Sequence, residues 1–282
     1  MAGERGAAPR QDVVRRLLAA GCVFADDEAG LLCAAARTPS EFDAMVARRV
    51  GGVPVEQIVG WARFCGARIT VGPGVFVPRP RTEFLVHQAI AVTRPGAVVV
   101  DLCCGSGAVG AAVAAAVGPI ELHAVDIDDA AVTCARCNLA AAGAQVYAGD
   151  LYGPLPVRLQ RRVDVLIANA PYVPTGDIAL MPRESRLHES LAALDGGADG
   201  LDVQRRIVAE AHRWLRPTGQ LLLETSEHQS RRTADIFRTA HMTTRVVSSK
   251  EYEATVVIGT AGRSQGDVPA ALAGGGVTAR LI

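Results

Sequence analysis

From residue 97 onward, short apolar runs alternate with stretches of helical periodicity, and this alternation constrains the fold most strongly. Strands are predicted at 97–102, 121–125, 145–148, 163–168 and 220–224, of which 97–102 is continuously apolar and 163–168 has the pattern of a buried strand. Helical patterns follow at 107–117, 129–142, 201–215 and 229–240. Alternating strands and helices predict a parallel, right-handed, doubly wound sheet. Two further runs, 243–248 and 254–258, are expected to pair antiparallel at the edge of the sheet.

The residues that join the first predicted strand to its helix, 101–107, are rich in glycine. Gly105, Gly107 and Gly110 give the pattern G-x-G-x-x-G, and Asp126 follows at the end of the second strand, about 20 residues on. Glycines let a ligand approach the backbone closely, and the acidic residue is expected to accept hydrogen bonds from ribose hydroxyls. A dinucleotide and S-adenosylmethionine both fit this pattern.

Two carboxylates favour S-adenosylmethionine over a nicotinamide dinucleotide. Asp101 stands where an ammonium group could bind and where a pyrophosphate would be repelled. Asp150 closes the third strand, beside the expected adenine, and no His or Lys suits hydride transfer. The predicted cofactor-binding residues of this region are Asp101, Cys103, Cys104, Gly105, Ser106, Gly107, Asp126, Ile127, Asp150 and Leu151.

The fourth strand runs into Asn169, Ala170, Pro171 and Tyr172. Pro171 cannot continue a central strand, so Asn169 lies at a carboxyl strand end, where open α/β sheets bind ligands. The Asn169 side-chain oxygen and the Ala170 carbonyl could accept the two hydrogens of a planar –NH2 group, with Tyr172 as a flat wall. Alone, the pattern also fits a strand that ends at a proline with a turn-forming Asn.

The region before the alternating pattern reads as a small helical module and a hairpin. Apolar faces predict three short helices within 11–50, the third opened by a capping box of Ser40 and Asp43. A hairpin is expected within 58–77, with its turn at 65–66. The predicted units are a helical substrate-docking domain (1–54), a hairpin and extended linker (55–80), a catalytic domain (81–260) and a flexible Gly/Ala-rich tail (261–282).

Composition narrows the class of protein further. Hydrophobic residues make up 49% of the 282 residues, and the formal net charge is zero, which argues against a strongly basic nucleic-acid binder. No apolar run reaches about 18 residues, and the first ten residues lack an apolar signal core, so we expect neither a membrane span nor export. Seven cysteines, an odd number, favour reduced thiols in the cytoplasm. Cys134 and Cys137 are expected to be core residues, with no metal bound.

With these motifs in order, the sequence resembles the HemK/PrmC family of protein-(glutamine-N5) methyltransferases. The resemblance covers roughly residues 10–260 and rests on the spacing of several runs: 52–60, 73–83, the glycine loop, 169–172, 196–201, 215–219, Glu224 and Gln229.

The resemblance implies a class I S-adenosylmethionine-dependent methyltransferase fold: Rossmann-like, with a mostly parallel seven-stranded sheet and a small N-terminal helical domain that docks substrate. It implies methyl transfer to the side-chain nitrogen N5 of a protein glutamine, in a class 1 peptide-chain release factor. The sequence departs from the family at Ala170, where a proline is usual, at Cys103, where a glycine is common, and at Arg81, where a glutamate is usual. These departures raise the possibility of a divergent paralogue.

The expected catalytic residues are Asn169, Ala170, Pro171 and Tyr172. An amide nitrogen is a poor nucleophile because its lone pair is delocalised. The two oxygens would orient the nitrogen and bind more strongly as charge builds on it, while Pro171 fixes the loop. Asn169 would also border the cofactor, and Phe76 is either a neighbour of its sulfonium or an ordinary core residue.

Two other functions fit the same motif. The exocyclic amine of adenine has the same –NH2 geometry, so an N6-adenine methyltransferase is the nearest chemical alternative, although it would need a base-flipping or phosphate-binding region. We expect no direct nucleic-acid partner and no membrane partner. A non-catalytic cofactor-binding paralogue is the alternative from another class, and Ala170 is its best support.

Overall fold

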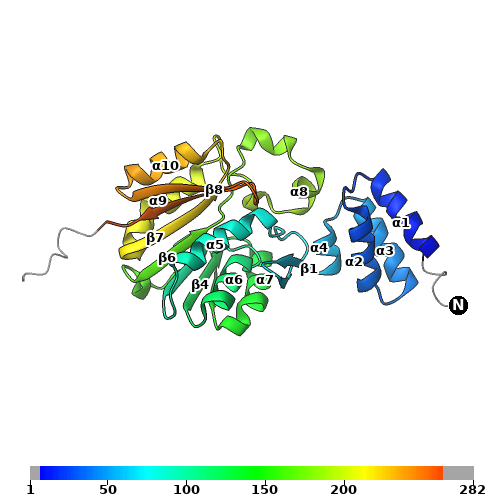
Figure 1. Cartoon of the computed structure of the whole chain (residues 1–282), viewed down its shortest axis with the longest axis horizontal. Coiled ribbons are helices and arrows are strands. Elements are labelled where there is room, and N and C mark those ends of the chain that lie inside the picture. Colours follow the sequence, from blue (N-terminus) through cyan, green and yellow to red (C-terminus); the bar gives the residue numbers. More distant parts are fainter. Residues whose placement is uncertain (1–6, 263–282) are drawn as a thin grey trace, which may run out of the picture.

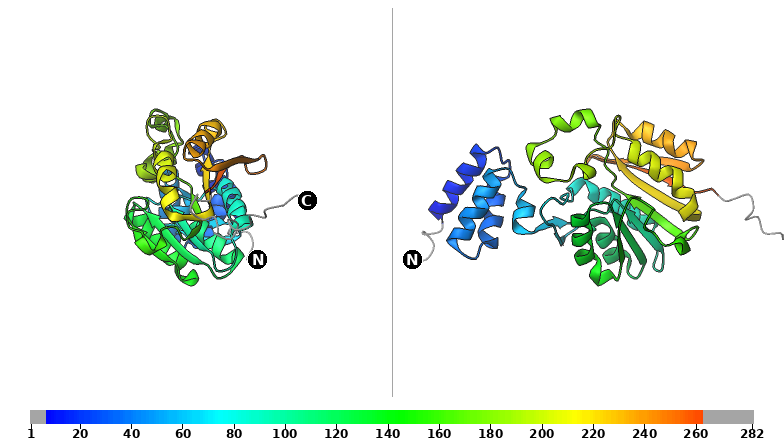
Figure 2. Two further views of the ribbon diagram at one scale, coloured as in Figure 1. Left: turned by 90° about the vertical axis from the view of Figure 1, so that its left-hand side faces the viewer. Right: turned by 180° about the vertical axis from the view of Figure 1, so that it is seen from behind.

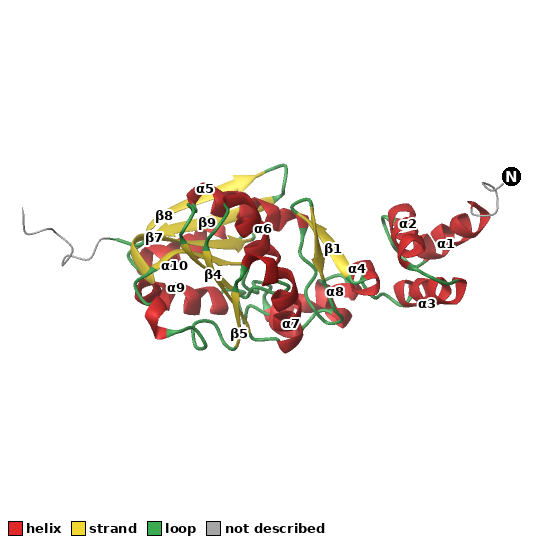
Figure 3. Ribbon diagram, turned by 90° about the horizontal axis from the view of Figure 1, so that it is seen from below, coloured by secondary structure: helices red, strands yellow, loops and turns green. Residues whose placement is uncertain are grey.

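The computed structural model describes residues 7–262 and shows two lobes (Figure 1). The smaller lobe holds the N-terminal helices α1 (Ala7–Ala19), α2 (Ala25–Ala35) and α3 (Pro39–Val50). Figure 3 shows the connection to the larger lobe, which runs through α4 (Val55–Val59) and the hairpin of β1 (Trp61–Phe64) and β2 (Ala67–Thr70). The N-terminal helices therefore form a small helical module beside the larger lobe.

The helical module has its own core and a capping box that differs from the predicted one. Thr38 Oγ1 accepts from the Glu41 backbone N–H at 3.1 Å, and the Glu41 carboxylate accepts from the Arg37 N–H at 2.8 Å. The prediction of Ser40 and Asp43 was therefore wrong by two residues. Pro39 explains the earlier start, because its fixed φ suits the first helical turn. Leu17, Leu32 and Val46 are fully buried at the centre of the module.

The larger lobe is a seven-stranded sheet in the order β5-β4-β3-β6-β7-β9-β8. All neighbouring pairs are parallel except β7–β9 and β8–β9. The strands are β3 (Val98–Leu102), β4 (Glu121–Asp126), β5 (Gln145–Ala148), β6 (Val163–Ala168), β7 (Leu215–Thr225), β8 (Thr243–Ser249) and β9 (Ala254–Thr260). The predicted doubly wound sheet with an antiparallel edge is confirmed.

Helices cover both faces of the sheet (Figure 2). One face packs on α5 (Glu83–Val92), α6 (Ala108–Val117) and α7 (Asp129–Leu139), and the other on α9 (Asp202–Trp214) and α10 (Ser230–Thr239). Along β6, Val165 and Ile167 face the first layer while Leu166 and Ala168 face the second, which explains why the run is continuously apolar.

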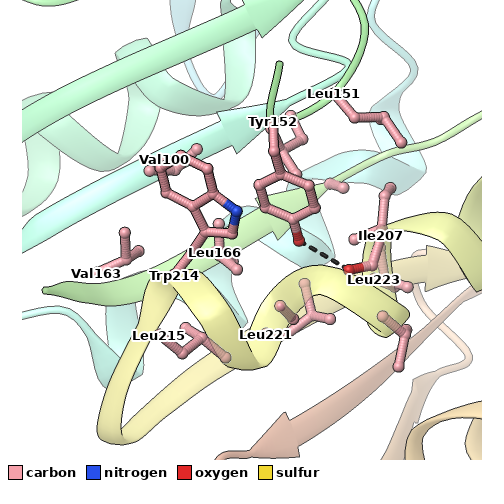
Figure 4. Close-up of a cluster of buried hydrophobic side chains, with 14 of the residues drawn as sticks. Val100, Leu151, Tyr152, Val163, Leu166, Ile207, Trp214, Leu215, Leu221 and Leu223 are labelled. Atoms are coloured by element: carbon pink, nitrogen blue, oxygen red, sulfur yellow. Dashed lines mark hydrogen bonds between the residues drawn. The ribbon is translucent and has the colours of Figure 1, made fainter. Parts of the chain in front are cut away.

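The core on the second face contains one stacked aromatic pair. Figure 4 shows Tyr152 beside Trp214, with ring centroids 5.5 Å apart. The Tyr152 hydroxyl donates to the Ile207 carbonyl at 2.8 Å, so this buried polar group is satisfied. The pair fixes α9 against the segment after β5, and thereby one side of the carboxyl edge of the sheet.

Several boundaries differ from the sequence predictions for local reasons. Ile58 lies in α4, so the hairpin spans only 61–70. Asp128 caps α7, because its carboxylate accepts from the Ala130 and Ala131 N–H groups. β7 begins at Leu215 rather than 220 because Leu215 pairs with Val163 before a register shift. The 3₁₀ turns are η1 (Pro80–Thr82), η2 (Ala140–Ala142) and η3 (Val157–Leu159).

The segment 171–200, which connects β6 to α9, is partly helical. It contains η4 (Thr175–Leu180), α8 (Arg183–His188) and η5 (Leu191–Ala193). α8 lies on the side of the larger lobe that faces the N-terminal module (Figure 1), and Arg49 of α3 pairs with Glu184 of α8 at 3.1 Å. The segment therefore connects the sheet edge to the helical module.

No helix within 7–262 is long and apolar enough to cross a membrane. The predicted flexible tail falls almost entirely on 263–282, which lie outside the described residues.

Candidate active site

The predicted catalytic residues follow β6 at the centre of the sheet. Ala168 pairs with Leu102 of β3 on one side and Leu223 of β7 on the other, so Asn169 emerges between two covered strands. A cleft opens at this edge. The predicted residues that line it are Phe76, Cys103, Gly105, Asp126, Ile127, Asp150, Leu151, Asn169, Ala170, Pro171 and Tyr172. The fold thus brings the glycine loop and the Asn169 motif into one cavity.

Contacts on both sides hold the Asn169 motif. Asn169 Nδ2 donates to Thr82 Oγ1 at 3.1 Å, and the Tyr172 hydroxyl donates to Glu224 Oε1 at a long 3.4 Å. The Arg81 guanidinium carbon lies 5.9 Å from the centre of the Tyr172 ring. Burial and the charge of Glu224 raise the pKa of Tyr172 to about 12, with Arg81 opposing them. Tyr172 is therefore a neutral phenol at pH 7, which does not favour a role as a base, and its role as a flat wall stays a prediction.

The backbone of Tyr172 is clamped by two residues from the runs shared with the family. Gln229 Nε2 donates to the Tyr172 carbonyl at 2.9 Å. Gly200 has φ +76°, and a Cβ placed there would lie 2.4 Å from the same carbonyl oxygen. Only glycine permits both that conformation and that approach. Sequence patterns mark these residues but do not reveal what they contact.

The glycine loop is shaped for a ligand at Gly105. Its φ is +53°, and a Cβ added there would meet nothing within 4 Å, so the open cleft begins at its backbone. Cys103 adopts φ +54°, which explains why glycine is common at this position in the family. Gly107 serves packing instead, because a Cβ there would come within 3.0 Å of the Leu139 side chain.

The Asp126 carboxylate stands at the end of β4, between the loop and the cleft. Its Oδ2 accepts from the Gly105 N–H at 2.8 Å and its Oδ1 from the Asp128 N–H at 2.9 Å. Burial raises its pKa, and these backbone hydrogen bonds lower it. Each oxygen retains a lone pair, so the carboxylate can still accept from a pair of hydroxyls.

Replacing Asp126 with alanine is expected to weaken S-adenosylmethionine binding by roughly 5- to 150-fold. The reason is that buried ribose hydroxyls lose an acceptor, which costs roughly 1–3 kcal/mol. Calorimetric titration of the folded variant measures the effect. Unchanged affinity would refute the assignment of Asp126 to the ribose.

Four of the predicted cofactor residues lie outside the cleft lining: Asp101, Cys104, Ser106 and Gly107. Asp101 is 1% exposed, and its Oδ2 accepts from the Gly110 N–H at 3.0 Å. Burial raises its pKa to about 7, Gly110 opposes this, and nearby Asp126 adds to it. Its contact with an ammonium group therefore stays a prediction.

The ligand-free protein is expected to lose stability as pH rises from about 4 to about 7, through Asp101. Across this window the folded state keeps a proton that the unfolded state has released, so each pH unit costs up to about 1.4 kcal/mol. Asp101→Asn should remove this component, which urea unfolding of both proteins at pH 5 and pH 8 measures. Parallel pH dependence in the two proteins would contradict the buried, protonated Asp101.

Several cleft residues are missed by sequence reasoning. Arg206 forms a short ion pair with Asp150 at the rim. Arg79 pairs with Glu189 at 2.6 Å, and its guanidinium carbon lies 4.7 Å from the centre of the Phe76 ring. A further group of unpredicted lining residues comes from 181–194, namely Met181, Ser190, Ala192, Ala193 and Leu194. No periodicity marks these residues, because they come from irregular backbone.

Other candidate sites in the described part of the chain lack catalytic features. A cavity of about 1060 Å³ lies against α9 and α10, but shares no lining residue with the cleft at the Asn169 motif. Within 7–262 no group of three or more His, Cys, Asp or Glu residues could hold a metal ion. All seven cysteines are free. Cys134 is buried, but the expectation that Cys137 is a core residue was wrong, because Cys137 lies on an exposed face of α7.

Comparisons with known proteins identify the class of the chain. Residues 68–198 match the family model "Methyltransferase small domain". A release factor glutamine methyltransferase of Mycolicibacterium smegmatis is 41% identical over 70% of this chain and 70% of its own. A 4-amino-L-phenylalanine/4-methylamino-L-phenylalanine methyltransferase of Streptomyces pristinaespiralis is 37% identical over 84% of this chain and 82% of its own. The structure of a Pyrococcus furiosus methyltransferase matches 70% of this chain and 90% of its own, with a TM-score of 0.52 and 17% identity. This match shows that the two proteins share a fold.

The sheet order, the glycine loop and the cleft define a class I methyltransferase, the class whose members use S-adenosylmethionine. Within that class, the chain belongs to the release factor glutamine methyltransferase family.

Proposed function

We propose that the protein transfers a methyl group from S-adenosyl-L-methionine to the side-chain amide nitrogen of a glutamine in a class 1 peptide-chain release factor. The observation that carries this proposal is the position of Asn169 and Ala170, at a central strand end and in the same cleft as Gly105 and Asp126. Release factors act on the ribosome, so the reaction would take place in the cytoplasm.

The residues of the cleft fit this cofactor. Gly105 leaves open space at its backbone, and Asp126 offers acceptors for ribose hydroxyls. When bound, S-adenosylmethionine supplies an activated methyl group on a sulfonium. Asn169 Oδ1 and the Ala170 carbonyl would accept the two N–H bonds of the glutamine amide and direct its nitrogen toward that group. Both hydrogen bonds strengthen as the nitrogen loses electron density, so they favour the transition state.

The alanine at position 170 keeps this chemistry possible. The acceptor at this position is the backbone carbonyl, which alanine retains. Ala170 is 1% exposed and Pro171 follows in the buried backbone, so packing replaces part of the rigidity that a second proline would give. This argues against a non-catalytic paralogue.

We further propose that residues 1–54 dock the protein substrate, with 55–80 as linker and 81–260 as the catalytic domain. Arg49 supports this arrangement, because it pairs with Glu28 inside the module at 2.6 Å and with Glu184 of α8 at 3.1 Å. Its two ion pairs tie the module to the segment that lines the cleft. A protein substrate could therefore contact both at once.

A second candidate is methylation of an aromatic amine on a free amino acid. The Streptomyces pristinaespiralis relative carries such a name and matches most of both chains. Arg81, about half exposed, lines the cleft beside Tyr172, where a substrate carboxylate would find a guanidinium partner. An aniline –NH2 is planar enough for the same two oxygens.

Incubation with methyl-labelled S-adenosylmethionine separates these functions. The acceptors are purified class 1 release factors, 4-amino-L-phenylalanine, and DNA and RNA as nucleic-acid controls. We expect label in a release factor, on one glutamine located by mass spectrometry and lost when that glutamine is changed to alanine. Label in the free amino acid or in nucleic acid would instead identify the alternative acceptor, and no label in any of them would favour the non-catalytic paralogue.

A further inference from the structure

We infer that Arg81 selects the acceptor, because its guanidinium binds a carboxylate that the acceptor carries close to the –NH2 group to be methylated. That carboxylate belongs either to an acidic side chain beside the target glutamine of a protein or to a free amino acid. The inference rests on the proposed methyl transfer in this cleft, and it adds a charge requirement that the proposed function does not contain.

Arg81 lies at the acceptor end of the cleft. It lines the cleft and directly precedes Thr82, whose Oγ1 accepts from Asn169 Nδ2 at 3.1 Å. Its guanidinium carbon is 5.9 Å from the centre of the ring of Tyr172, the residue expected to pack on the acceptor. A group held by Arg81 would therefore lie beside the acceptor, away from the ribose expected at Asp126.

Three arginines line the cleft, and two of them are already paired with carboxylates. Arg79 pairs with Glu189 at 2.6 Å, and Arg206 forms a short ion pair with Asp150. Among the residues that the structure describes, Arg81 has no carboxylate partner at such a distance. Its charge is therefore the one that a ligand in the cleft can use most fully.

Glu224 is the carboxylate nearest to Arg81, and it engages the guanidinium only weakly. Its Oε1 lies 3.7 Å from Arg81 Nε, which is beyond hydrogen-bond distance. The Glu224 side chain is 2% exposed and does not line the cleft, whereas the Arg81 side chain is 49% exposed. Within 7–262 the two terminal nitrogens of Arg81 make no hydrogen bond, and these are donors that match a carboxylate in a bidentate pair.

The charge at position 81 departs from the family, in which a glutamate is usual there. Glu224 lies in a run that the family shares, so a guanidinium at position 81 is not required to accompany it. The replacement of glutamate by arginine reverses the charge that an acceptor meets beside Tyr172. Such a reversal favours acceptors with a negative group and disfavours those with a positive one.

Three single variants test the role of Arg81. Arg81→Gln removes the charge, Arg81→Lys keeps it, and Arg158→Gln is the matched control. Arg158 is also about half exposed and also lies 3.7 Å from a carboxylate, that of Glu121, but it does not line the cleft. We expect Arg81→Gln to raise the KM for the acceptor roughly tenfold, with kcat and the KM for S-adenosylmethionine within about twofold of wild type. Arg81→Lys should recover most of the affinity, and Arg158→Gln should change neither KM.

A matched pair of acceptors shows whether Arg81 acts on the carboxylate. For a free amino acid the pair is 4-amino-L-phenylalanine and its carboxamide. For a release factor the pair is the natural protein and a variant in which the acidic residues flanking the labelled glutamine are changed to amides. Loss of the carboxylate should raise the KM about tenfold in the wild-type protein and by less than about twofold in Arg81→Gln, because the two partners form one interaction. The arm in which this coupling appears identifies the source of the carboxylate.

A second readout needs no turnover. The Arg81 Nε–H signal is identified in a ¹⁵N-edited NMR spectrum by its disappearance in Arg81→Gln. With S-adenosylhomocysteine present, 4-amino-L-phenylalanine should shift this signal, and its carboxamide should leave it in place.

Failure of the inference and failure of the proposed function give different results. A wild-type KM for the labelled acceptor in a folded Arg81→Gln variant, or an equal cost of carboxylate loss in both proteins, would overturn the role of Arg81 while methyl transfer stands. If the wild-type protein labels none of the acceptors, the proposed function fails. The NMR signal then decides alone, and an unshifted Arg81 signal would overturn the inference.

Discussion

Asn169→Ala should reduce methyl transfer by a factor of about 10² to 10³, the usual cost of removing one preorganised hydrogen-bonding group that acts in the transition state. The variant leaves Gly105, Asp126 and the rest of the glycine loop untouched, so S-adenosylmethionine should bind within about tenfold of wild type, or roughly 1.4 kcal/mol. Single-turnover kinetics and calorimetric titration on the same preparation measure the two effects.

The role of Asn169 follows from comparing the loss of methyl transfer with the loss of cofactor affinity. A large loss of methyl transfer with nearly unchanged cofactor affinity would mean that the Asn169 side chain binds the acceptor nitrogen. Equal loss of both would mean that Asn169 acts in cofactor binding or in folding, and the assignment of its side-chain oxygen to the acceptor would be wrong.

Gly200→Ala should destabilise the protein by about 3 kcal/mol, the sum of a left-handed backbone cost of 1–2 kcal/mol and a steric clash. Gly200 has φ +76°, and an added Cβ would lie 2.4 Å from both the Tyr172 carbonyl oxygen and Gln229 Nε2. The clash would displace the Tyr172 backbone, so kcat should fall as well. Urea unfolding and the methyl-transfer assay measure these changes.

Gly176→Ala is the matched control in the same segment. A Cβ at Gly176 would meet nothing within 4 Å, and its φ lies outside the left-handed region. This variant should change stability by less than about 0.5 kcal/mol. If Gly200→Ala behaves like Gly176→Ala, the clamp on the Tyr172 backbone does not support the site.

The sheet is predictable because its signals are local. The runs at 145–148 and 163–168 match β5 and β6 residue for residue. β6 lies inside the sheet and is largely buried and apolar on both faces, whereas β5 is a partly exposed edge strand. The strand-end rule then places Asp126 and Asn169 at one edge without any knowledge of contacts. The same rule cannot tell that Asp101 points beneath the loop, because burial depends on how α6 packs over it.

Other parts of the site depend on contacts between residues distant in sequence. Thr82 lies 87 residues before Asn169, and Gln229 lies 57 residues after Tyr172. No periodic pattern encodes such pairs, and the lining from 181–194 comes from short irregular turns. The cap predicted at Ser40 fails for a different reason: Thr38 and Ser40 are both good caps, and only the backbone conformation separates them.

A crystal structure of the protein with S-adenosylmethionine tests the central claim most directly. The account predicts that Asn169 Oδ1 and the Ala170 carbonyl oxygen both face the sulfonium methyl group, with room between for one nitrogen at a near-attack distance of roughly 3–3.5 Å. It also predicts Asp126 on the ribose. A complex in which the two oxygens turn away from the methyl group, or in which the Asn169 NH2 group faces it, would contradict the account.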